Sequence, residues 1–254
     1  MTTFGLPWRA LSLVAVLAAW EAAGRFGMSL SLPPFSEVVA ALLRLADDGS
    51  LVAAIGETLR PVIVGTMLSL IVGVTLGLAM GLSRVTEAAF VGILICLDTA
   101  PMAALVPLIA SIYGVGFAAK LAAVMLLAVP IVALNAYRGI HAVNPILLDM
   151  HRSFVGSRWR GIVTIMLPAA SGMLAAGIRL GVAGAFVGAI LAELLISTSG
   201  IGELIVFNRA IGKYAEMYAA IVAFVILAAG TLALLRMIER RMLPAERWAG
   251  AAVA

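Results

Sequence analysis

The connection over residues 144–168 carries the side chains best suited to contact another protein. It is long, basic and amphipathic, and Asn144 followed by Pro145 is a typical start of a helix. Apolar residues recur after that start at helical spacing, with charged residues among them. An exposed helix of this kind fits a groove in a partner protein, and it also fits the surface of a membrane.

Three charged residues stand within apolar runs or at their ends, namely Asp98, Arg179 and Glu193. A charge in lipid is costly, so each is a candidate for a solute pathway or for a seam between subunits. Arg179 and Glu193 are fourteen residues apart, close to four helical turns, and therefore share a helix face. A cation there would suit an anionic solute. A structural ion pair or hydrogen bond explains both equally well, and Asp98 could instead stabilise a break before Pro101.

Several kinds of chemistry are excluded by residue type. The two histidines, His141 and His151, lie in the same basic region, and neither a metal-ligand cluster nor a nucleophile motif accompanies them. The single cysteine, Cys96, excludes an intramolecular disulfide. Gly212-Lys213 lacks the earlier glycine and the following Ser or Thr of a phosphate-binding loop. We therefore expect neither an enzyme nor a chain that binds a metal or cofactor.

The composition predicts a membrane protein. Of 254 residues, 63% are hydrophobic and 12% are charged, against about a quarter charged in a soluble domain. The net charge is +4, but the basic residues form no patch for nucleic acid and lie mostly beside apolar runs, as orientation signals do. The fold class expected is all-α, a polytopic membrane helix bundle in contact with the lipid bilayer.

About six transmembrane helices fit the apolar pattern, because each needs roughly 20 apolar residues. The predicted spans are 8–27, 60–82, 88–112, 117–138, 168–196 and 214–238. Ten basic residues lie in connections on the side of the N-terminus and six on the other, which predicts that both termini are cytoplasmic. The first run also resembles a secretory signal, but an uncleaved first helix serves equally well.

One membrane domain is expected over residues 1–254. Residues 1–59 would hold the first span and a periplasmic interfacial segment, 60–240 the core, and 241–254 a cytoplasmic tail. In the interfacial segment, Ser36 is the expected cap of a short helix whose apolar face lies along the interface. Glycines at helical spacing predict close central packing of the second and fifth spans. These glycines are Gly73, Gly77, Gly81, Gly177, Gly181, Gly184 and Gly188.

The connection over residues 144–168 resembles a motif of ABC importer permeases. That motif reads Glu-Ala-Ala, three residues, Gly, nine residues, then Ile-x-Leu-Pro. Asp149 falls at the Glu position and Val155 at the Gly position, and Ile165, Leu167 and Pro168 follow in register. His151 and Val155 depart from the motif, so coupling to an ATPase could be altered unless Gly156 takes over the turn.

Further segments resemble the nitrate, sulfonate and taurine branch of that family. They are 101–107, 113–116, 177–180 and 192–195, and the resemblance extends over about residues 32–244. It implies a permease subunit of the bacterial inner membrane, with a cytoplasmic coupling helix between spans four and five. The coupling residues implied are Asp149, Met150, Phe154, Gly156, Arg158, Trp159 and Pro168.

The partners implied are a cytoplasmic ABC ATPase that uses ATP and Mg²⁺, a periplasmic substrate-binding protein, and a second permease copy in a homodimer. The solute would be small and anionic, such as nitrate, a sulfonate or taurine, and a pyrimidine-type vitamin precursor is the alternative. A secondary transporter also uses broken helices and charges in the membrane, but it has no need of the Asp149–Pro168 loop.

Overall fold

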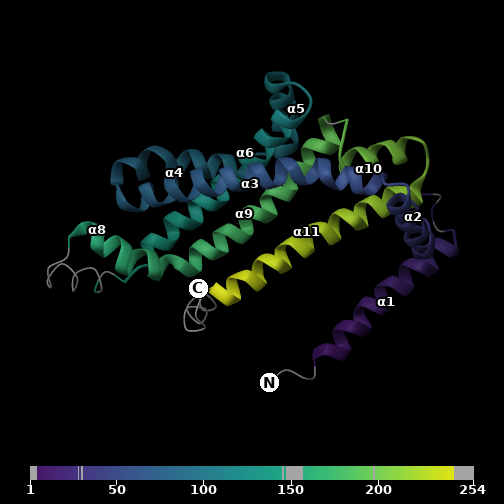
Figure 1. The fold of residues 1–254 in the computed structure, drawn as a ribbon, viewed down its shortest axis with the longest axis horizontal. Helices are drawn as coiled ribbons and strands as arrows, with labels where there is room; N and C mark the ends of the chain where they lie inside the picture. The colour runs from purple at the N-terminus through teal and green to yellow at the C-terminus, as the bar shows by residue number, and fades with distance from the viewer. Residues whose placement is uncertain are drawn as a thin grey trace. The chain divides into compact units, whose positions relative to one another are not determined.

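The computed structural model describes residues 5–27, 29, 31–144, 146, 157–196 and 198–242, and the elements described are all helical (Figure 1). They are α1 (Gly5–Arg25), α2 (Phe35–Asp47), α3 (Ser50–Leu82), α4 (Arg84–Thr99), α5 (Met102–Tyr113), α6 (Phe117–His141), α8 (Arg158–Gly161), the π-helical turn η1 (Ile162–Met166), α9 (Leu167–Ile196), α10 (Ile201–Ala210) and α11 (Tyr214–Met242). The all-α expectation is confirmed.

Four helical stretches of the described residues are long and apolar enough to cross a membrane. They are Ser50–Leu82, Phe117–His141, Ile162–Ala210 and Tyr214–Glu239. The pair α4 and α5 makes a fifth if it is counted as one span. The predicted number of six therefore remains a prediction.

The third predicted span, 88–112, is wrong as a continuous helix. It is divided into α4 and α5, whose axes differ by 104°. Ala100 between them has an extended backbone, with φ −65° and ψ 142°. The cause is Pro101, because the residue before a proline is disfavoured in the α conformation. The sequence left open that Asp98 stabilises a helix break before Pro101, and the structure has such a break two residues after Asp98.

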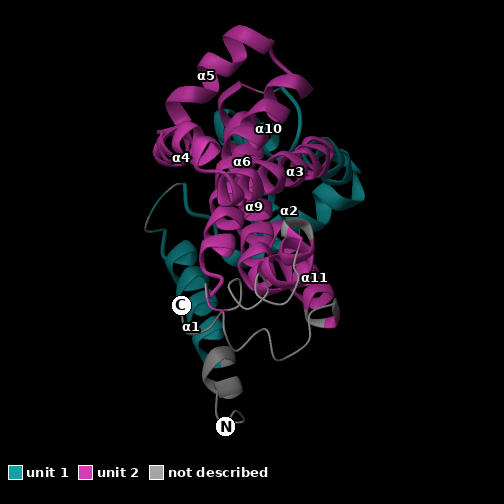
Figure 2. Ribbon diagram, turned by 90° about the vertical axis from the view of Figure 1, so that its left-hand side faces the viewer, with its two compact units in different colours: residues 1–58, 198–227 teal, residues 59–197, 228–254 magenta. Residues whose placement is uncertain are grey.

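The chain divides into two compact units, which Figure 2 distinguishes by colour. Unit 1 comprises residues 1–58 and 198–227, and unit 2 comprises residues 59–197 and 228–254. Helices α3 and α11 each contribute residues to both units. The single membrane domain over residues 1–254 stays a prediction.

In unit 1, the amphipathic helix α2 buries one apolar face. That face joins a cluster with residues of α3 and α11, consisting of Val38, Ala41, Leu45, Leu51, Ala219 and Ala223. Val39 and Leu43, on the other side of α2, are exposed. The apolar residues predicted to lie together along an interface are therefore divided between a protein core and the surface.

The predicted cap of α2 is also wrong. The N-cap is Pro34, and Ser36 lies within the first turn. The amide N–H and the hydroxyl of Ser36 both donate to the carboxylate of Glu21, each at 2.9 Å. Glu21 thereby satisfies an amide that a helix N-terminus leaves without an intrahelical partner.

Helix α10 in unit 1 was not predicted. Its first residue, Ile201, is fully buried, and the Ile201 amide donates to the hydroxyl of Thr58 at 3.0 Å. Gly200, with φ 99°, is its N-cap. Ten residues of mixed polarity do not form the long apolar run by which a spanning helix is recognised.

In unit 2, α6 is the helix against which both glycine-rich helices pack. A Cβ atom at Gly188 of α9 would lie 2.7 Å from the carbonyl oxygen of Ala123 in α6. A Cβ atom at Gly77 of α3 would lie 2.4 Å from the carbonyl oxygen of Ala133. Such separations are closer than van der Waals contact, so the backbones approach as they do only at glycine.

Candidate functional site

The central part of the predicted coupling loop lies outside the described residues. This applies to Asp149, Met150, Phe154 and Gly156. Arg158 and Trp159 belong to α8, whose backbone is described although these two side chains are not. The roles assigned to all six residues stay predictions.

The start of the loop follows the end of α6 at His141. The amide of Ile146 donates to the side-chain oxygen of Asn144 at 2.9 Å. This is the bond that a capping asparagine makes at the beginning of a turn or helix. Ile146 itself is 65% exposed.

The end of the loop contains an unusual backbone turn. The amide of Leu167 donates to the carbonyl oxygen of Ile162, five residues earlier, and residues 162–166 form the π-helical turn η1. Pro168 is the next residue. It has no N–H to donate to the carbonyl oxygen of Thr164, and its ring crowds that carbonyl. A widened turn is the physical result. Pro168 is thus placed in the first turn of α9, where a missing N–H costs little.

Glu193, predicted to face a pathway or seam, is buried in unit 2 near the end of α9. Its side chain is inaccessible, and the ammonium group of Lys120 in α6 donates to its carboxylate at 3.0 Å. Lys120 is equally buried, with 3% of its side chain exposed. This is the structural ion pair that the sequence left open as an alternative. Lys120 was missed because it was counted as a charge of the outer connection.

Arg179 forms a different ion pair. Its guanidinium group donates to the carboxylate of Glu239, which is 8% exposed in α11. The second carboxylate oxygen of Glu239 is buried and accepts no hydrogen bond from a described residue. Arg179 and Glu193 therefore do not meet in the structure, although both belong to α9. Each joins α9 to another helix instead.

Asp98 lines a cavity of about 410 Å³ in unit 2, together with Asn135 and Arg138 of α6. Asp98 and Arg138 are both exposed. The remaining wall consists of residues of α6 and α9, namely Ile131, Leu134, Leu180, Ala183, Gly184 and Val187. We call this cavity the polar groove. It combines a carboxylate, an amide and a guanidinium group with an apolar wall.

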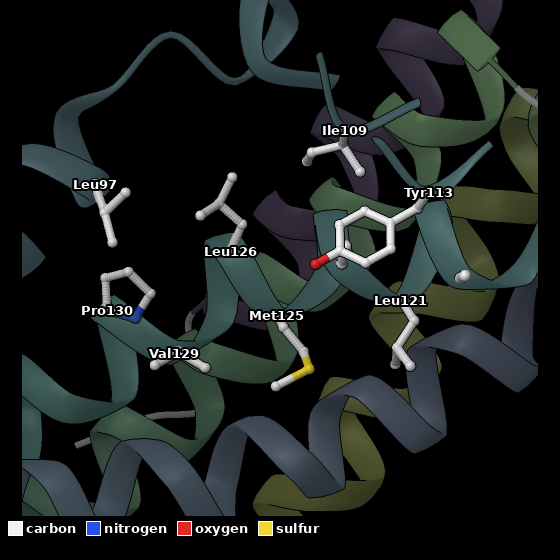
Figure 3. A pocket seen from close by; sticks show the side chains of 10 residues that line it. Leu97, Ile109, Tyr113, Leu121, Met125, Leu126, Val129 and Pro130 are labelled. Carbon is white, nitrogen blue, oxygen red and sulfur yellow. The ribbon is translucent and has the colours of Figure 1, made fainter. Parts of the chain in front are cut away.

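A second cavity of unit 2, of about 510 Å³, is almost entirely apolar. Figure 3 shows Tyr113 projecting into it toward the side chains of α6, among them Met125 and Leu126, with Ile109 near Tyr113 and Leu97 at the opposite edge. Its lining contains no charged residue. This cavity can hold an apolar group but has no means of orienting a charged solute.

Three side chains connect the start of α4 with the end of α6. The Tyr137 hydroxyl donates to the Glu87 carboxylate at 2.6 Å, and the rings of Tyr137 and His141 lie 4.4 Å apart. The ring nitrogen of His141 is 4.0 Å from Glu87. Among the described residues no group of three or more His, Cys, Asp and Glu could hold a metal ion.

Comparison with known proteins gives one family. The family described as "Binding-protein-dependent transport system inner membrane component" matches residues 65–244. The chain is 28% identical to the putative aliphatic sulfonates transport permease protein of Bacillus subtilis (strain 168), covering 90% of this chain and 83% of that protein. It is 25% identical to the taurine transport system permease protein of Escherichia coli (strain K12), covering 92% and 87%.

The fold is similar to that of a solved structure, the inward-facing MetNI methionine ABC transporter. The TM-score is 0.65 at 18% identity, over 76% of this chain and 96% of the chain compared. At this identity the likeness concerns the fold. It supports the arrangement of apolar helices described above.

Proposed function

The chain belongs to the family of binding-protein-dependent transport system inner membrane components, and on this premise we propose that it forms the pathway for uptake of a small anionic solute, a sulfonate or taurine-like compound. The observation that carries the proposal is the match over residues 65–244, which include the loop motif from Asp149 to Pro168. The chain is a multi-pass permease of an ABC importer. It is a transport subunit rather than an enzyme.

The driving force would come from a separate ATPase in the cytoplasm. In this proposal the loop forms a coupling helix, Phe154 fills a groove of the ATPase, Asp149 orients the helix, and Arg158 pairs with an acidic rim. ATP and Mg²⁺ would be used by that subunit, and this chain would bind no cofactor. The widened turn at residues 162–166 supports a special role for the loop, since π-helical turns are frequent at functional sites.

A periplasmic binding protein would deliver the solute to the outer end of the pathway. A second copy of this chain would complete the pathway as a homodimer, with both termini in the cytoplasm. Exposed charges of the polar groove support a water-filled pathway, because Asp98 and Arg138 are costly against lipid.

The solute class is supported by the names of two similar proteins, which are sulfonate and taurine permeases. The alternative is a pyrimidine-type vitamin precursor. It is favoured by a formylaminopyrimidine transport permease protein of Halalkalibacterium halodurans, which is 24% identical over 76% of this chain.

Uptake by cells of the native host tests the solute class. The gene for this chain is deleted and then restored on a plasmid, and uptake of radiolabelled taurine, ethanesulfonate, nitrate and formylaminopyrimidine is measured. We expect the deletion to abolish uptake of taurine or ethanesulfonate and the plasmid to restore it. Loss and recovery of formylaminopyrimidine uptake alone would establish the alternative.

A further inference from the structure

The two charged side chains of the polar groove have no ionic partner among the described residues. No described basic group lies within ion-pair distance of Asp98, and no described acidic group lies within that distance of Arg138, although both line one cavity. The other charges within these helices behave differently, since Glu193 and Arg179 are each paired with a residue of a neighbouring helix. Asp98 and Arg138 are therefore available to a ligand.

The polar groove is lined mainly by residues of two helices, α6 and α9. Its residues on α6, from 131 to 138, and on α9, from 180 to 187, each span eight residues, or about 10 Å along the helix axis. Ala183 and Gly184 in α9 contribute almost no side-chain volume, which leaves the hollow open. A small solute with charges a few bonds apart fits these dimensions.

Asn135 is held in place beside the charges. A Cβ atom at Gly177 would lie 2.6 Å from the Cβ of Asn135, so the absence of a side chain there admits Asn135. The Asn135 amide nitrogen donates to the carbonyl of Ile131 at 2.8 Å, which leaves its amide oxygen available as an acceptor. The groove therefore offers an acceptor and a carboxylate for a cationic group, and a guanidinium for an anionic group.

We infer that the polar groove binds a zwitterionic ω-aminosulfonate during transport, with its sulfonate on Arg138 and its ammonium group on Asp98 and Asn135. The inference rests on the proposed function and adds to it the site and the charge pattern of the solute. A plain alkanesulfonate can pair with Arg138 alone, whereas an ω-aminosulfonate can pair with Arg138 and with Asp98.

The test compares taurine with ethanesulfonate, which has the same carbon chain and sulfonate but lacks the ammonium group. Uptake of both radiolabelled solutes is measured in the gene-deleted host carrying wild type, Asp98→Asn or Arg138→Gln. Asp98→Asn should lower the ratio of taurine uptake to ethanesulfonate uptake about tenfold, and Arg138→Gln should lower uptake of both solutes about tenfold, as expected for loss of a charge-assisted hydrogen bond.

Asp47→Asn and Arg84→Gln are matched controls, because both residues are exposed and neither lines the groove. Immunoblots of membranes measure the amount of each variant, and Arg138→Lys, which keeps the charge, should retain more uptake than Arg138→Gln. An unchanged solute ratio in Asp98→Asn present at the wild-type level would overturn the inference while leaving the proposed function intact. A wild-type chain that restores uptake of neither solute would overturn both.

Discussion

Charged residues within the apolar helices are of two kinds. Lys120 and Glu193 are buried and bonded to each other, and Arg179 is bonded to the buried Glu239. Asp98, in contrast, is exposed along the polar groove with Arg138. The paired charges fix the helices, because a buried charge is tolerated only with a partner. Asp98 and Arg138, which have no ionic partner among the described residues, are the charges that we propose to interact with a solute.

Removing one member of the buried pair should destabilise the protein strongly. We expect Lys120→Met to lower the free energy of unfolding by about 3–5 kcal/mol, since it leaves the Glu193 carboxylate buried without Lys120. Arg44→Met is the matched control, because Arg44 is 63% exposed in its pair with Glu216, and such pairs contribute only about 0–1 kcal/mol. Thermal unfolding in detergent measures both. Equal effects of the two variants would contradict a structural role for the buried pair.

Asp48, in the turn before α3, has a lowered pKa that can be tested. The Ser50 side chain beside the Asp48 carboxylate, and the Ser50 amide that donates to that carboxylate at 2.8 Å, lower the pKa of Asp48 below the ordinary value of 3.8. A lowered pKa means that the carboxylate stabilises the folded state above that ordinary value. This contribution is lost as the pH falls through the folded-state pKa.

Ser50→Ala should therefore raise the pKa of Asp48 toward its ordinary value while the amide bond remains. Carbon-13 NMR of labelled aspartate in detergent micelles measures the titration. A pKa of Asp48 that is the same in wild type and Ser50→Ala would show that the hydroxyl does not contribute.

At the scale of helices, α6 organises unit 2 because glycines of α3 and α9 approach its backbone. The spacing of those glycines in the sequence was sufficient to predict close packing. That both pack against the fourth predicted span, which is α6, was not predictable, because the small residues of α6 carry no comparable signal. The break at Ala100 was overlooked although Pro101 marks it, since the apolar run continues through it. Nor did hydropathy indicate η1, which follows from the crowding of a carbonyl by Pro168.

A methyl group at Gly188 tests the close approach of α9 and α6. Gly188→Ala places a Cβ atom 2.7 Å from the Ala123 carbonyl oxygen and 2.9 Å from the Val124 Cα. Since both are backbone atoms, the helices must separate, and we expect a loss of about 1–3 kcal/mol of stability.

Gly92→Ala in α4 is the control, because a Cβ atom there meets nothing within 4 Å. It should stabilise the helix by about 0.5–1 kcal/mol. Unfolding in detergent measures whether each variant is less or more stable than wild type. A Gly188→Ala variant as stable as Gly92→Ala would refute the close contact.

At the scale of the whole molecule, the family and its fold class could be recognised from the sequence, because the loop motif and the hydropathy are both local features. The pairing of charges could not, since Lys120 and Glu193 are 73 residues apart and meet only in the folded protein. Lys120 also entered the count of basic residues that predicts orientation, although it is buried. Without it, the bias of ten against six toward cytoplasmic termini becomes ten against five.

The predicted orientation of the termini rests on this bias. A C-terminal fusion of alkaline phosphatase, which is active only after export, should therefore be inactive, whereas a fusion after Gly49, in the connection between α2 and α3, should be active. Enzyme activity in intact cells measures both fusions. An active C-terminal fusion would place the tail outside the cytoplasm and reverse the side assigned to the coupling loop.

Recovery of an ATPase with the purified protein tests the central claim most directly. The tagged chain is solubilised from its native membrane in mild detergent, alongside Phe154→Ala and Asp149→Arg in the loop. Phe26→Ala and Asp47→Arg are the controls, since both residues are exposed and lie outside the loop. We predict that an ABC ATPase accompanies the wild type and both controls and is lost from both loop variants. A preparation of wild type free of ATPase, under conditions that preserve known importers, would contradict the account and favour a secondary transporter.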